Sequence, residues 1–210
     1  MFKQIPLGPI QTNAYVLYNS NKDAVVFDPG GDGSAFTEWL KAEQLNPIAI
    51  LLTHAHFDHI GAVDDVKEAF DCPVYLHKAE QDWLGDPALN GSARLTGRAL
   101  TTAQPADKLL TGDGPLTIGS FSFELLHTPG HSPGSISYYY QEENIVFSGD
   151  ALFQHSIGRT DLNGGNQNQL LESIHNKILK LPEDTIVASG HGPLTTIQAE
   201  MDHNPFLSGF

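Results

Sequence analysis

Three histidines and one aspartate fall within six consecutive positions of this chain, in the motif H-A-H-F-D-H directly after the apolar run Ile48–Leu52. Imidazole nitrogens and carboxylate oxygens are common ligands for zinc, iron and manganese. The apolar run predicts a buried strand, which places the motif in the turn at its C-terminal end. A loop there can direct His54 and His56 to one point, and Asp58 and His59 to a neighbouring point. Because one metal needs three or four ligands, the motif predicts further ligands downstream.

Three later segments place His or Asp at the end of an apolar run, beside a glycine: L-L-H-T-P-G-H, I-V-F-S-G-D and I-V-A-S-G-H-G-P. They supply His131, Asp150 and His191, which complete a set of five histidines and two aspartates. Such a set suits two metals about 3.5–4 Å apart that share a carboxylate. His127 competes with His131 for one position, and we favour His131 because it lies in the turn beside Gly130.

The ordered motifs H-x-H-x-D-H, T-P-G-H, S-G-D and G-H-G-P resemble those of the metallo-β-lactamase superfamily, over nearly the whole chain. The resemblance implies an α/β (α+β) fold, the four-layer αββα sandwich, which we expect as a single domain over residues 1–210. It implies two divalent metal ions. Zinc is the favoured element, and iron and manganese are the alternatives. The implied ligands are His54, His56 and His131 for the first metal; Asp58, His59 and His191 for the second; and Asp150 as the bridge.

The residue at position 150 separates subfamilies. β-Lactam-hydrolysing members carry Cys where this chain has Asp150, and flavodiiron oxidoreductases carry Glu where it keeps His56. The pattern resembles glyoxalase II, hydroxyacylglutathione hydrolase, and the motifs V-F-D-P-G-G, G-R-T-D and G-H-G-P are typical of short bacterial relatives of that enzyme. We therefore expect a binuclear metallohydrolase that cleaves a small-molecule thioester such as S-lactoylglutathione with a metal-bridging hydroxide. Asp58 and Asp150 are the expected catalytic residues.

The chain departs from full-length glyoxalase II at its C-terminal end. That enzyme carries a C-terminal helical domain that helps to bind glutathione, whereas 19 residues follow His191 here. We expect either that glutathione is held in another way or that the substrate is a different thioester. Thioester cleavage itself needs no strong general acid, because a thiolate with a pKa of about 8.5 leaves readily.

Other activities stay open on the same scaffold. A persulfide dioxygenase would hold one Fe(II) with His56, His131 and Asp150 as a facial triad. The same hydroxide could also cleave a lactone or a phosphodiester. A binding or scaffold protein without activity is disfavoured, because all seven ligands are retained.

Residues outside the ligand set have weaker assignments. Asp28 could orient a ligand histidine or close a turn. Arg159 is expected to pair with Asp161 rather than to contact substrate, although substrate contact stays open for it and for Arg94 and Arg98. The other histidines are expected to be surface or packed residues. Asp58 has a second possible role as a helix N-cap.

The charge composition disfavours partners that carry many negative charges. The chain has 11 basic and 25 acidic residues and a net charge of −14, which argues against nucleic acid and against anionic membranes. A single cysteine, Cys72, allows no intrachain disulfide and is expected to be a buried thiol. No secretory signal or membrane-spanning stretch is evident, so we expect a cytoplasmic protein. The sequence predicts no oligomeric state.

Periodicity predicts alternating elements. Expected helices are Phe36–Leu45, Ala62–Phe70, Gln167–Leu179 and Thr195–His203. Expected strands are Phe2–Ile5, Tyr15–Tyr18, Ala24–Phe27, Ile48–Leu52, Val74–Leu76, Leu116–Ile118, Phe121–Leu126, Ser135–Tyr140, Asn144–Phe147 and Thr185–Ala188. The segment Trp83–Pro105 shows no periodicity, and such long segments are usually functional or mobile.

Overall fold

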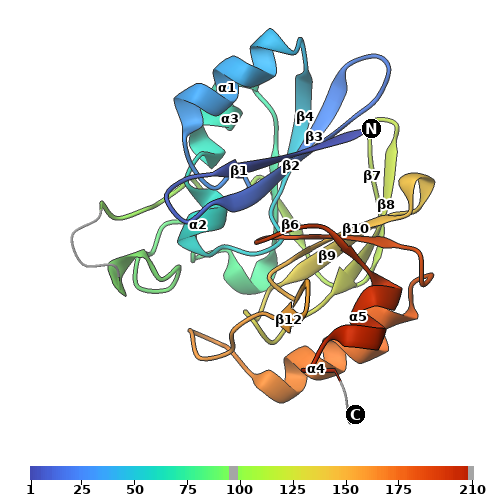
Figure 1. Cartoon of the computed structure of the whole chain (residues 1–210). Coiled ribbons are helices and arrows are strands. Elements are labelled where there is room, and N and C mark those ends of the chain that lie inside the picture. Colours follow the sequence, from blue (N-terminus) through green and yellow to red (C-terminus); the bar gives the residue numbers. More distant parts are fainter. Residues whose placement is uncertain (95–98, 208–210) are drawn as a thin grey trace. The chain divides into compact units, whose positions relative to one another are not determined.

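The computed structural model describes residues 1–94 and 99–207, and the chain divides into two compact units, Met1–Leu110 and Thr111–Phe210. Each unit contains a six-stranded sheet with helices (Figure 1). The mixed α/β class is therefore confirmed, while a single domain over the whole chain stays a prediction. In the described part of the chain, every helix is too short or too polar to cross a membrane.

The sheet of the first unit has the order β1-β2-β3-β4-β5-β6. Its strands are β1 (Phe2–Leu7), β2 (Thr12–Tyr18), β3 (Asp23–Phe27), β4 (Asn46–Leu51), β5 (Val74–His77) and β6 (Lys108–Leu110). The pairs from β1 to β3 are antiparallel, and those from β3 to β6 are parallel. Parallel neighbours need long crossovers, and α1 (Gly33–Ala42) and α3 (Val63–Phe70) lie in two of these.

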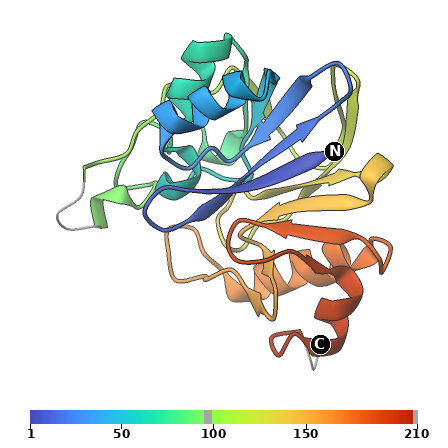
Figure 2. The same ribbon diagram turned by 45° about the horizontal axis from the view of Figure 1, so that its top comes forward.

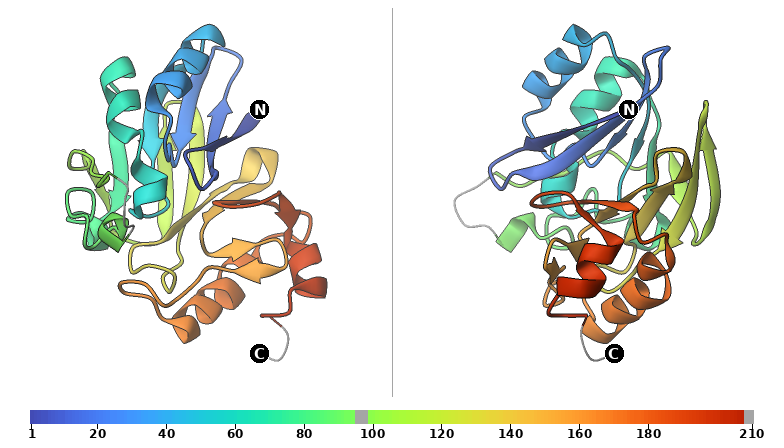
Figure 3. Two further views of the ribbon diagram at one scale, coloured as in Figure 1. Left: turned by 60° about the vertical axis from the view of Figure 1, so that its left-hand side comes forward. Right: turned by 45° about the vertical axis from the view of Figure 1, so that its right-hand side comes forward.

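Helices α1 and α3 lie side by side and cover one face of this sheet (Figure 3). Phe36 and Leu40, the residues whose spacing predicts α1, are buried in the core of this unit. The helix ends earlier than predicted, at Ala42, because Gln44 adopts a left-handed conformation with φ 59°. The amide of Leu45 then reaches the carbonyl of Leu40 at 3.0 Å, as in a Schellman end.

The sheet of the second unit has the order β14-β13-β10-β9-β8-β7. Its strands are β7 (Gly114–Ile118), β8 (Phe121–His127), β9 (Ile136–Tyr140), β10 (Ile145–Gly149), β13 (Ile186–Ser189) and β14 (Thr195–Thr196). Only β10 and β13 pair in parallel among them. Helices α4 (Gln167–Asn176) and α5 (Ile197–His203) lie near each other in the ribbon, in orange and red (Figure 2). They share one apolar core with this sheet, built from residues such as Leu170, Ile197 and Val187.

Several short elements have no periodic signal in the sequence. These are β6, the hairpin of β11 (Leu152–Phe153) and β12 (Ser156–Ile157), and α2 (Phe57–Ile60). Strand β14 covers the first two residues of the predicted helix Thr195–His203, so that helix begins later than predicted, at Ile197. Within the segment predicted to lack periodicity, a short 3-10 helix covers Ser92–Arg94. The side chain of Asn90, fully buried, organises the neighbouring chain by donating to the carbonyls of Trp83 and Thr101 at 3.1 and 2.9 Å.

Candidate metal centre

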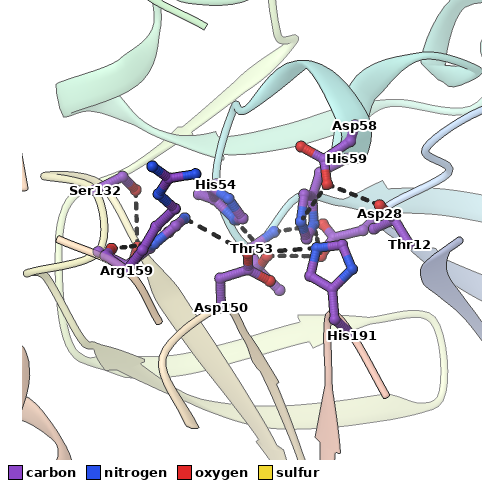
Figure 4. A network of polar contacts seen from close by, with 12 residues as sticks. Thr12, Asp28, Thr53, His54, Asp58, His59, Ser132, Asp150, Arg159 and His191 are labelled. Atoms are coloured by element: carbon purple, nitrogen blue, oxygen red, sulfur yellow. Dashed lines mark hydrogen bonds and ion pairs between the residues drawn. The ribbon is translucent and has the colours of Figure 1, made fainter. Parts of the chain in front are cut away.

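In the first unit, the ends of two parallel strands bring Asp28 to the histidine motif. Strands β3 and β4 pair Phe27 with Leu51, so the residues that follow them leave the sheet at the same edge. The buried carboxylate of Asp28 accepts hydrogen bonds from the amide of Thr53 at 2.7 Å and from its hydroxyl at 2.6 Å. A third donor, Nδ1 of His59, lies 3.0 Å from Asp28 Oδ2 (Figure 4).

These contacts define which ring nitrogens carry protons. A carboxylate oxygen accepts, so Nδ1 of His59 is the donor, and Nε2 is the nitrogen left to bind a metal. The Thr53 hydroxyl donates to Asp28 and therefore accepts from Nδ1 of His54, 3.1 Å away. Of the two roles open for Asp28, the structure supports the orienting role.

Asp58 lies beside His59, with 3.5 Å between Oδ2 and Nε2. This separation is long for a hydrogen bond. Two ligand atoms each about 2.0–2.2 Å from one tetrahedral ion would lie about 3.3–3.6 Å apart, so the pair fits a shared metal. The hydroxyl of Thr12 donates to Asp58 Oδ2 at 2.8 Å. The alternative role of Asp58 as an N-cap is wrong, because His56 is the N-cap of α2 and Asp58 lies inside the helix.

The loop that carries the motif is fixed by residues that sequence reasoning missed. Glu80 is fully buried, and its Oε2 accepts from the amide of Ala55 at 2.6 Å, between two candidate ligands. The ring of His56 lies 5.7 Å from that of Trp83. Gly30 packs on the carbonyl of Asp58, where a Cβ atom would overlap the oxygen. A single glutamate among polar residues gives no sequence signal for such a role.

In the second unit, two parallel strands again deliver the candidate ligands. Strands β10 and β13 pair Gly149 with Ser189, and Asp150 and His191 follow shortly after. Oδ2 of Asp150 lies 3.5 Å from Nε2 of His191 and 3.6 Å from Nε2 of His131. One carboxylate oxygen thus lies beside two imidazole nitrogens at distances typical of ligands around a metal.

His131 is also oriented through its other nitrogen. Its Nδ1 lies 2.7 Å from the carbonyl oxygen of Arg159, so Nδ1 donates and Nε2 is left to face Asp150. By contrast, Nε2 of His127 lies 3.0 Å from the carbonyl of Pro133. The structure therefore places His131, the favoured residue, beside Asp150.

The chain between Asp150 and Arg159 is held by the C-terminal helix. The fully buried carboxylate of Glu200 accepts from the amide of His155 at 2.8 Å, and also from Thr195 and Asn204. Gly158 packs on the carbonyl of Asp150, where a Cβ atom would overlap the oxygen. Glu200 and Asn204 thereby support the segment whose Arg159 carbonyl orients His131.

The structure also describes most of the residues that the sequence places outside the ligand set. Arg159 forms an exposed, bidentate ion pair with Asp161, with two bonds of 2.7 Å, as predicted. Arg94 is exposed, and Arg98 lies outside the described residues. Burial raises the pKa of the Cys72 thiol to about 11, which keeps it protonated and unreactive near neutral pH. The other histidines make contacts of their own: Nδ1 of His77 accepts from the amide of Ala79, Nδ1 of His175 meets the carbonyl of Leu171, and His155 and His203 have neighbouring rings.

Both sets of donors suit divalent transition metals. They contain imidazoles with one nitrogen directed by a hydrogen bond, and carboxylates at spacings that suit ligands of one metal. Borderline ligands of this kind accept zinc, iron and manganese, so the donors define a metal class and leave the element open.

Comparisons with known proteins agree with this chemistry. The family model of the metallo-beta-lactamase superfamily matches residues 7–191. The chain is 58% identical to the Probable metallo-hydrolase YqgX of Bacillus subtilis (strain 168), covering 100% of this chain and 98% of the relative. It is 36% identical to the hydroxyacylglutathione hydrolase GloC of Haemophilus influenzae (strain ATCC 51907 / DSM 11121 / KW20 / Rd), covering 97% and 96%.

Two solved structures are also similar. The crystal structure of the B3 metallo-β-lactamase BLEG-1 is 74% identical with a TM-score of 0.97, covering 100% of both chains. The structure of TTHA1623 in a di-iron-bound form is 41% identical with a TM-score of 0.87, covering 98% of this chain and 100% of that one. The match over residues 7–191 and these identities show that the chain belongs to the metallo-β-lactamase superfamily.

Proposed function

We propose that the protein is a metal-dependent hydrolase that cleaves a thioester, S-lactoylglutathione or a related compound, at a centre of two divalent metals. The observation that carries the proposal is the position of Asp150 Oδ2, within 3.6 Å of Nε2 of both His131 and His191. A carboxylate so placed suits a bridge between two metals. Similarity to a relative named hydroxyacylglutathione hydrolase supports the thioester class.

Residues of this chain orient the ligands of the proposed metal centre. When bound, two divalent metals would supply a hydroxide near neutral pH and polarise the thioester carbonyl. Asp28 holds the Nδ1 side of the His59 ring, and the carbonyl of Arg159 holds that of His131, so Nε2 is the nitrogen of each ring that is left to bind a metal. As ligands, Asp58 and Asp150 would offset two of the four positive charges of such a metal pair, and the remaining charge would be available to stabilise an oxyanion. The departing thiolate needs no protein acid, because its pKa is about 8.5.

The test combines metal content with turnover. Metal-free protein is loaded separately with zinc, iron and manganese, metal per chain is measured, and S-lactoylglutathione is added with a thiol-trapping dye. The proposal predicts two metals per chain and thiol release well above buffer. Protein with two metals that releases no more thiol than buffer would exclude this substrate. One iron per chain with oxygen uptake on glutathione persulfide would favour a dioxygenase instead.

β-Lactam hydrolysis is a second candidate. The structure of BLEG-1, a B3 metallo-β-lactamase, is 74% identical to this chain. Asp150 in place of Cys disfavours this activity, whereas the 74% identity to BLEG-1 favours it. A chromogenic cephalosporin, assayed on the same two-metal preparation, separates the candidates. Turnover of the cephalosporin with no thioester hydrolysis would select the second one.

A further inference from the structure

A cavity of about 350 Å³ lies beside Asp58 in the first unit. Within the described part of the chain, Asp58 is the one lining residue with a formal charge. The other walls are apolar side chains, glycine backbone and a threonine. The principal lining residues are Leu7, Pro9, Ile10, Phe57, Asp58 and Thr101.

The walls of this cavity are fixed by hydrogen bonds. The turn between β1 and β2 closes through the amide of Gln11, which donates to the carbonyl of Gly8 at 3.2 Å. The amide of Gly8 donates in turn to Asp32 Oδ2 at 2.8 Å. Ile10, which is 41% exposed, is thereby held at the rim. Phe57, another lining residue, is held by its amide, which donates to the carbonyl of Asn90 at 3.0 Å. A preformed apolar wall of this kind is typical of ligand sites.

We propose that this cavity is the acyl subsite, and that it selects thioesters with an uncharged, apolar acyl group. The inference rests on the proposed function. A thioester that reacts beside Asp58 could place either its acyl group or its thiol carrier in the cavity. Apart from Asp58, the described lining residues are uncharged, so they suit an uncharged group better than a charged thiol carrier. The acyl group is then the one that enters.

The subsite predicts a dependence on acyl length. Each buried methylene contributes a factor of about four to binding. On glutathione thioesters from acetyl to hexanoyl, kcat/KM should rise by up to about fourfold per methylene until the cavity is full. Ile10→Asp should flatten the rise, because it places a charge on the apolar rim. Leu109→Asp is the matched control, since Leu109 is 45% exposed and does not line this cavity.

A second readout needs no turnover. Hexanamide is an uncharged analogue of the acyl group, and it should shift the Ile10 methyl resonance saturably but leave those of Leu109 in place. An acyl series that is flat, or that rises equally in Ile10→Asp, would overturn the subsite while thioester hydrolysis stands. A preference that follows the thiol instead of the acyl group would also overturn it. Absence of any thioester hydrolysis would refute the proposed function, and the hexanamide titration then decides the subsite on its own.

Discussion

Nδ1 of His59 lies 3.0 Å from Oδ2 of Asp28, in a pair that is buried on both sides. The same carboxylate accepts two hydrogen bonds from Thr53, whose hydroxyl meets Nδ1 of His54. One aspartate therefore orients two candidate ligands, one directly and one through a hydroxyl. Because Asp28 follows β3 and Thr53 follows β4, the parallel pairing of these strands is what brings them together.

Replacing Asp28 tests this orienting role. Asp28→Asn keeps the shape but removes the charge that fixes both imidazole protons. Loss of such an outer partner typically lowers metal affinity about 10–100-fold, and we expect a decrease in that range. Competition with a chromogenic chelator measures it. Asp161→Asn, at an exposed ion pair, is the control and should leave affinity unchanged. Equal affinities in the two variants would refute the role.

Gly158→Ala should destabilise the second unit. The new Cβ would overlap the carbonyl of Asp150 and approach the Cβ of His131, so the backbone must shift. Overpacking of this kind costs about 1–3 kcal/mol, measurable by urea unfolding. Gly85→Ala is the control, because nothing lies within 4 Å of a Cβ there. A variant as stable as the wild type would show that the close approach to Asp150 is not needed.

Glu200→Gln should weaken the hydrogen bonds by which Glu200 holds the segment that follows Asp150. The buried carboxylate accepts three hydrogen bonds, and an amide would turn one acceptor into a donor that faces donors. Hydrogen bonds to buried charged groups contribute about 1.5–3 kcal/mol, so unfolding free energy should fall by about that amount. Metal affinity should fall with it. Glu172→Gln on the exposed side of α4 should change neither quantity. Unchanged metal affinity in Glu200→Gln would show that Glu200 does not support the candidate metal centre.

Asp107 should make the first unit acid-sensitive. Burial raises the pKa of its carboxyl, but the hydrogen bonds from Lys67 and Val74 outweigh this and hold that pKa below its usual value. The contribution to stability is therefore present above the ordinary carboxyl pKa of about 3.9 and is lost as pH falls through the lower folded value. After screening by solvent, Asp107→Asn should cost about 0.5–1 kcal/mol at pH 7. In urea unfolding, the difference should shrink toward pH 3, and a difference independent of pH would contradict this explanation.

The sequence predicts the candidate ligands because they share a local signal. Each follows an apolar run, so strand burial and turn position together locate His54, Asp150 and His191. The supporting residues carry no such signal. Glu80 acts on an amide 25 positions away, and Glu200 on one 45 positions away. Their roles depend on tertiary contacts, so their own surroundings in the sequence look like ordinary polar surface.

Element boundaries show the same division between local and tertiary causes. The stripe of Leu170 and Ile174 predicts α4, which begins at Gln167 as expected. Strand β6 has two exposed residues among its three and forms only by pairing with β5, so no periodicity could reveal it.

Metal content of the Asp150→Ala variant, measured beside thioester turnover, tests the central claim most directly. The wild type should bind two divalent metals per chain and release thiol from its substrate. Asp150→Ala should lose metal at both positions and lose turnover, while its circular dichroism is retained because separate strands position the other ligands. His127→Ala is the matched control and should keep both metals. Two metals and full turnover in Asp150→Ala, or a metal lost from His127→Ala but not from His131→Ala, would contradict the account.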